Sequence, residues 1–182
     1  MMYVKIPKSR IGVLIGKKGE VKKKVESISG VKLIVDSRYG DVTIDDRDAN
    51  AYMAMKAKEF VEAVGNGFSP DRAWRIFKED VYFEEIDIRD FVGKKENRIR
   101  VLKGRIIGKN GKTRRIIEEL SGADISLYGN TIAIIGEYYQ LETAKKAIEM
   151  LLRGSKHATI YGYLEKRRRD MKYLPFDYYY LQ

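Results

Sequence analysis

The chain has 182 residues, of which 44% are hydrophobic and 34% are charged, and this composition fits a globular protein. It contains no cysteine, which excludes a disulfide framework and a thiolate metal site, and no apolar run is long enough for a transmembrane helix. Its 36 Lys and Arg residues outnumber its 26 Asp and Glu residues, and the net charge of +10 favours a polyanionic partner over an acidic protein.

The first half of the chain predicts a mixture of helices and strands. In chain order we expect a strand at 3–6 that Pro7 ends, a helix at 8–15, a loop at 16–19, a helix that Gly30 stops, strands at 31–36 and 42–44, and a long helix capped by Asp48 or Asn50. The predicted order of elements is β-α-α-β-β-α.

The second half repeats the first. Four glycines recur at one constant offset of about 90 residues, so that Gly12, Gly16, Gly19 and Gly30 correspond to Gly104, Gly108, Gly111 and Gly122. Here we expect a strand at 82–88, a longer basic connection, a helix, a glycine loop, a helix, strands at 124–127 and 131–135, and a helix at 138–152. The chain is therefore predicted to be a duplication.

The segments outside the repeat are predicted to be helical. Ser69-Pro70-Asp71 begins a linker helix whose Trp74 we expect to be buried between the halves rather than to stack on a base. We predict domains at 1–67 and 82–154, a linker helix at 68–81, a C-terminal basic helix at 155–172 and an aromatic tail at 173–182. We expect the basic helix and the tail to dock on a partner and to be unnecessary for folding.

Each half carries a short basic loop between two glycines, Gly16-Lys17-Lys18-Gly19 and Gly108-Lys109-Asn110-Gly111. Glycine permits positive φ, and the N–H groups that open the following helix point outward with the positive end of its dipole, so a phosphodiester backbone fits there. A run of Lys and Arg surrounds each loop. The alternative, that these runs are only solvated helix faces, leaves their coincidence with the loops unexplained.

Two β-α-α-β-β-α units, each with a G-x-x-G loop between its first two helices, resemble the KH domain of the eukaryotic type, in which that loop clamps about four nucleotides of single-stranded RNA. The resemblance implies an α+β fold of two tandem type I KH domains packed together. It also implies an apolar groove in which bases would face Ile11, Ile15 and Ile34, or Ile106, Ile107 and Ile125.

A closer resemblance covers nearly the whole chain. Gly67-Phe68-Ser69-Pro70, the stretch 103–113 and Gly154-Ser155 with Ile160-Tyr161 are similar to the archaeal and eukaryotic ribosome-assembly proteins of the Dim/Krr type. This resemblance implies binding near the 3′ end of small-subunit rRNA or its precursor, and contact with the endonuclease that trims that end. The first loop is intact in this chain, whereas eukaryotic members tend to have a degraded one, which suggests an archaeal member.

The predicted RNA-binding residues are the two loops, their flanking cations and the neighbouring isoleucines. They are Gly108, Lys109, Asn110, Gly111, Lys112, Arg105, Arg114, Arg115, Ile106 and Ile107 in the second half, and Gly16, Lys17, Lys18, Gly19, Arg10 and Ile15 in the first. The second loop should contribute more, because arginine offers bidentate phosphate contacts that lysine does not.

The sequence gives little support for catalysis, a cofactor or a metal. Gly111-Lys112-Thr113 ends like a P-loop, but Ile106 stands where that motif needs glycine. His157 is expected to be a cap or a surface residue. The acids Asp45, Asp46 and Asp48 could form a metal cluster, but they lie at a strand-to-helix junction, where acids cap helices.

The sequence thus predicts a cytoplasmic, non-enzymatic, single-stranded RNA-binding ribosome-assembly factor that works with small-subunit assembly intermediates. Two alternatives stay open: a general KH regulator of mRNA translation or RNA decay, and an interaction scaffold whose basic faces only confer solubility.

Overall fold

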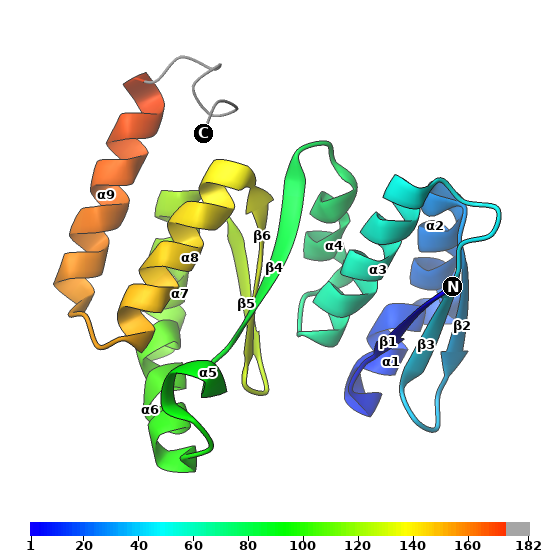
Figure 1. The fold of residues 1–182 in the computed structure, drawn as a ribbon, viewed down its shortest axis with the longest axis horizontal. Coiled ribbons are helices and arrows are strands. Elements are labelled where there is room, and N and C mark those ends of the chain that lie inside the picture. The colour runs from blue at the N-terminus through cyan, green and yellow to red at the C-terminus, as the bar shows by residue number, and fades with distance from the viewer. Residues whose placement is uncertain (174–182) are drawn as a thin grey trace. The chain divides into compact units, whose positions relative to one another are not determined.

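The computed structural model describes residues 1–173 and divides into two compact units, Met1–Phe83 and a second unit that begins at Glu84 (Figure 1). The predicted aromatic tail therefore lies, except for Tyr173, outside the described residues. No helix within residues 1–173 is both long enough and apolar enough to cross a membrane.

The first unit has the predicted order of elements. Its members are β1 (Met2–Lys5), α1 (Lys8–Ile15), the 3-10 turn η1 (Lys17–Gly19), α2 (Glu20–Ser29), β2 (Lys32–Asp36), β3 (Asp41–Asp45), α3 (Ala51–Gly65), α4 (Pro70–Ala73) and the 3-10 helix η2 (Trp74–Phe77). The strands form a sheet in the order β1-β3-β2, with β3 antiparallel to both neighbours. One face of this sheet is buried through Val4, Leu33, Val42 and Ile44.

The second unit repeats the arrangement and adds a helix. Its sheet includes β4 (Val81–Asp87), which begins just before the boundary at Glu84. The elements that follow are α5 (Arg89–Val92), α6 (Glu96–Ile107), the 3-10 turn η3 (Lys109–Gly111), α7 (Lys112–Ser121), β5 (Asp124–Tyr128), β6 (Thr131–Glu137), α8 (Tyr138–Leu152) and α9 (His157–Tyr173). The sheet order β4-β6-β5 matches the order in the first unit. Both halves confirm the predicted α+β class and the β-α-α-β-β-α order.

Local signals explain several boundaries. The Asn50 side chain accepts a hydrogen bond from the Tyr52 N–H (2.8 Å), so of the two predicted caps Asn50 is the one that opens α3. Helices α2 and α7 both end at a glycine in the left-handed region, Gly30 and Gly122, at φ 75° and 80°.

The predicted linker helix is short and packs on the first unit. Trp74 stacks on Phe60 of α3 with a ring-centroid distance of 4.4 Å, and the Lys24 amine lies 4.3 Å from the Trp74 ring centre. Phe60 is fully buried. Trp74 itself is half-buried rather than buried as expected, and it packs against the aromatic core of the first unit.

Helix α9 corrects the expectation that the basic C-terminal helix is unnecessary for folding. Ile160 and Leu164 have no exposed surface and belong to the core of the second unit, together with Ile117 of α7 and Leu141 of α8. Figure 1 shows α9 running alongside α8. The first half of α9 is therefore a structural part of the second unit.

Candidate nucleic-acid interface

The two glycine loops have the same backbone. Residues 16–19, the first loop, and residues 108–111, the second loop, each leave a helix through a first glycine at φ 74° or 72° and enter the next helix through a glycine at φ 77° or 75°. The third residue is also left-handed in both, Lys18 at φ 52° and Asn110 at φ 54°. Asparagine tolerates this conformation better than lysine does.

The first position of each loop requires glycine for a steric reason as well as for its positive φ. A Cβ on Gly108 would lie 2.2 Å from Thr113 Oγ1, and a Cβ on Gly16 would lie 2.5 Å from Val21 Cγ2. The following helix therefore approaches the loop as closely as glycine allows.

The helix that follows each loop opens without a side-chain cap. Neither Gly19 nor Gly111 supplies a capping side chain, so the N–H groups of the first turn of α2 and α7 point outward with the positive end of the dipole. The first turn of α2 contains Glu20, whereas that of α7 contains no acid. The second loop is therefore the more favourable place for an anion.

Most of the predicted polar and basic loop residues are exposed, so a ligand can contact them. Lys17 and Lys18 are exposed in the first loop, and Lys109, Asn110 and Lys112 are exposed in the second. Arg115 is also exposed and donates from Nη2 to the Asn110 carbonyl oxygen (3.0 Å), which holds its guanidinium against the second loop. Arg114 is half-buried, and its Nε atom has no hydrogen-bond partner in residues 1–173.

Two predicted RNA-binding arginines form hydrogen bonds within the protein. Arg10 donates to the carbonyl oxygens of Val64 (2.8 Å) and Phe68 (2.7 Å) at the end of α3. Arg105 donates to the carbonyl oxygens of Leu151 and Ser155 at the end of α8. Val64 and Leu151 lie in the last turns of α3 and α8, and Phe68 and Ser155 follow those helices by three residues. The two arginines therefore tie α1 to the end of α3 and α6 to the end of α8.

The predicted isoleucines divide between core and surface. Ile106 and Ile125 are 1% and 0% exposed and pack in the core of the second unit, so almost none of either side chain is open to a base in this structure. Ile107 is 38% exposed beside the second loop and Ile15 is half-buried beside the first. Ile34 is 52% exposed on its strand, as an apolar base contact requires.

Sequence reasoning missed a basic hollow between α6 and the turn that joins β5 and β6. Its volume is about 300 Å³, and its lining residues are Glu96, Ile99, Arg100, Lys103 and Asn130. The four from α6 follow the i, i+3, i+4, i+7 spacing of one helix face, so a search for helical periodicity among the cations could have found it. In the first half, Lys8 and the buried Ile11 stand at the positions equivalent to Arg100 and Lys103.

Helix α9 is connected to the second loop. The Tyr161 hydroxyl lies 3.2 Å from Thr113 Oγ1, and Thr113 is the residue that closely faces Gly108. His157 Nε2 lies 3.0 Å from the Arg105 carbonyl oxygen, in the last turn of α6. Both contacts fix the two helices that flank the second loop.

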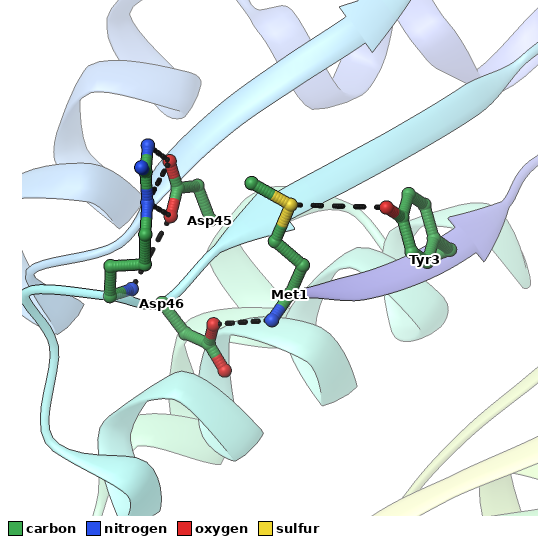
Figure 2. A network of polar contacts seen from close by, with 5 residues as sticks. Met1, Tyr3, Asp45 and Asp46 are labelled. Atoms are coloured by element: carbon green, nitrogen blue, oxygen red, sulfur yellow. Dashed lines mark hydrogen bonds and ion pairs between the residues drawn. The ribbon is translucent and has the colours of Figure 1, made fainter.

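The acids near the end of β3 are engaged within the protein. Arg47 Nε and Nη2 donate to the Asp45 carboxylate at 2.9 and 2.7 Å, and the Met1 amino group donates to Asp46 Oδ1 at 2.7 Å (Figure 2). The hydrogen bonds from Arg47 lower the pKa of Asp45 to about 2, and the Met1 ammonium lowers the pKa of Asp46. Within residues 1–173, no group of three or more His, Asp or Glu residues is placed to hold a metal ion.

Both halves of the chain match known domain families. A model of the eukaryotic-type KH domain (KH-domain type I), from the second KH domain of PNO1, matches residues 82–169, and a KH-domain model matches residues 1–52.

Two curated proteins and one solved structure show how far the similarity extends. The chain is 49% identical to KH domain-containing protein MJ0443 of Methanocaldococcus jannaschii, across 96% of this chain and 77% of that protein. It is 36% identical to the pre-rRNA-processing protein pno1 of Aspergillus fumigatus, across 78% of this chain but only 57% of that protein. A chain of the a/eIF2alpha–aDim2p–rRNA complex of Pyrococcus horikoshii superposes with a TM-score of 0.86 at 48% identity, covering 93% of this chain and 94% of that one.

Proposed function

The chain belongs to the PNO1/Dim2 family of KH-domain proteins, and we propose that it is a single-stranded RNA-binding ribosome-assembly factor. It acts in the cytoplasm at the 3′ end of small-subunit rRNA or its precursor. There it assists maturation together with the endonuclease that trims this end, as a binding protein rather than as an enzyme.

The observation that carries this proposal is the second loop. It combines an acid-free helix N-terminus, a backbone that glycine keeps open, and the exposed cations Lys109, Lys112 and Arg115. The hollow beside Arg100 and Lys103 adds positive charge along α6. Such a surface suits a phosphodiester backbone whose bases are unpaired.

The relatives support the RNA that we name. Proteins similar to this chain are called pre-rRNA-processing proteins, and a similar chain was crystallised in a complex that contains rRNA. The chain spans about half the length of the fungal relatives, so the endonuclease partnership is our inference for the part that is shared.

Crosslinking in the native host tests the proposal. RNA crosslinked to the chain is sequenced, and reads should accumulate at the 3′ end of the small-subunit rRNA precursor. A Lys109→Asp/Asn110→Asp variant, which keeps both loop glycines, should lose that accumulation. Reads scattered over many transcripts would instead identify a general KH regulator of mRNA translation or RNA decay.

The endonuclease partnership has its own readout. Depletion of the chain should leave precursor with an uncut 3′ end, and the loop variant should not restore cleavage. Normal trimming of the precursor after depletion would rule out the endonuclease partnership but would not contradict the proposed RNA binding.

A further inference from the structure

Helix α9 lies against both α7 and α8 and presents a different flank to each. Toward α8, the Arg167 guanidinium lies 4.3 Å from the centre of the Tyr139 ring. Toward α7, the Tyr161 hydroxyl lies 3.2 Å from Thr113 Oγ1. Leu164 is buried between these two flanks. The side of α9 that carries Tyr161 is therefore the side that faces α7.

Helices α9 and α7 run in the same direction, starting beside the second loop. Near its start, α7 contacts α9 through Thr113 and Tyr161, and near its end Leu120 shares a hollow with Arg168. The two pairs are separated by seven residues on each helix, which corresponds to about 10 Å. The second half of α9 thus extends the surface of α7 away from the second loop.

This second half is strongly basic where it meets α7. A hollow of about 340 Å³ is lined by Leu120 of α7 and by Glu165, Arg168, Arg169 and Lys172 of α9. Its three cations are exposed, and within residues 1–173 their side chains form no ion pair or side-chain hydrogen bond. Within residues 1–173, the one carboxylate that lines the hollow, Glu165, and the half-buried Asp170 next to it in sequence leave a surplus of positive charge.

The lining indicates which kind of ligand fits. Among the residues within 1–173 that line the hollow, Leu120 is the one apolar side chain, whereas the centre of a protein interface is usually apolar and depleted in charge. Two arginines offer planar donors that match phosphate oxygens bidentately. The hollow also lies on the same helix whose first turn adjoins the second loop. A polyanion that leaves the loop can therefore reach it.

We propose that the α7–α9 hollow is a second phosphate-backbone site, which holds the RNA segment adjoining the four or so nucleotides clamped by the second loop. This inference rests on the proposed RNA-binding function and extends it: the second unit binds a longer strand than one KH loop requires. The basic part of α9 then contributes to affinity only when the strand extends beyond the loop.

Two RNA lengths test the site. Binding of single strands of about five and about fifteen nucleotides, both including the sequence selected by the chain, is measured by fluorescence anisotropy over a range of salt concentrations. The test variant is Arg168→Ala/Lys172→Ala. The control variant, Lys78→Ala/Lys146→Ala, removes the same charge at two exposed lysines, one in the first unit and one on α8. Thermal melting checks that all proteins are folded.

For the longer RNA, the test variant should lower the slope of log K against log salt by about 1.4, because each phosphate contact on a single strand contributes about 0.7. The short RNA and the control variant should show no such change. An unchanged salt slope for the long RNA would overturn the proposed site. So would an equal decrease of the slope for the short and the long RNA, or for the test and the control variant. If the unaltered chain binds neither RNA in a salt-dependent way, the proposed function itself fails.

Discussion

At the scale of residues, the surroundings of a cation decide what it can bind. Arg105 and Arg115 lie one on each side of the second loop, and from the sequence both were candidates for phosphate contacts. The structure ties Arg105 to carbonyls in and just after the last turn of α8, whereas Arg115 stays exposed and donates to the backbone of the second loop. No spacing in the sequence distinguishes them, because the carbonyls that Arg105 meets lie more than forty residues away.

We expect Arg105 to contribute to the stability of the protein and Arg115 to contribute to RNA binding. Arg105→Ala removes charge-assisted hydrogen bonds at a helix end and should lower the free energy of unfolding by about 1.5–3 kcal/mol. Arg115→Ala should leave stability within about 0.5 kcal/mol but lower the salt dependence of RNA binding. Denaturant unfolding and salt titration measure the two effects. Unchanged stability in the first variant together with unchanged binding in the second would contradict these roles.

The contact between Asp45 and Arg47 predicts an acid-range titration. The pKa of Asp45 is lowered from 3.8 to about 2 by the hydrogen bonds from Arg47, so the stabilisation from this pair is complete above pH 4 and is lost as pH falls toward 2. An NMR titration of the carboxyl carbon should give a midpoint near pH 2, and Arg47→Ala should return it to about 3.8. A midpoint of about 3.8 in the unaltered protein would show that the pair does not form in solution.

At the scale of elements, the most informative differences concern α9. Its position was predictable from composition, but its contribution to the core was not. Only Ile160 and Leu164 are fully buried on this helix, and two apolar residues in a polar, basic sequence give a weak amphipathic signal. By contrast, the strands and the helices α2 and α7 were predictable, since periodicity and a terminal glycine coincide there.

Truncating a buried side chain of α9 should destabilise the second unit. Leu164→Ala leaves a cavity among α7, α8 and α9, and we expect the free energy of unfolding to fall by about 2–5 kcal/mol. The neighbouring exposed Lys166→Ala is the matched control and should change it by less than about 0.5 kcal/mol. If Leu164→Ala behaves like the control, α9 is not part of the folded core.

The two loops should contribute unequally to RNA binding. Lys109→Asp/Asn110→Asp should lower the salt slope by about one unit, because a phosphate contact is lost and carboxylates face the RNA. The corresponding Lys17→Asp/Lys18→Asp change removes more positive charge, yet it should cost less affinity because Glu20 already disfavours an anion at the first loop. A greater loss from the first loop, measured in the same titration, would reverse this ranking.

At the scale of the whole molecule, duplication made the fold predictable. Two copies of one glycine pattern, each within the same order of elements, determine the type of domain more firmly than either copy alone. The interface was predictable only in part. The loop cations follow from the sequence, whereas the hollow beside Asn130 and the one beside Leu120 depend on which helices and turns pack together.

We propose above all that this chain binds unpaired RNA through its second loop. The most direct measurement is a salt titration of the chain with a single strand from the 3′ end of small-subunit rRNA and with a duplex of the same sequence. We expect much tighter binding of the single strand, a steep loss of affinity with salt, and weaker binding by Lys109→Asp/Asn110→Asp. Equal affinity for single strand and duplex, or full affinity in that variant, would contradict it.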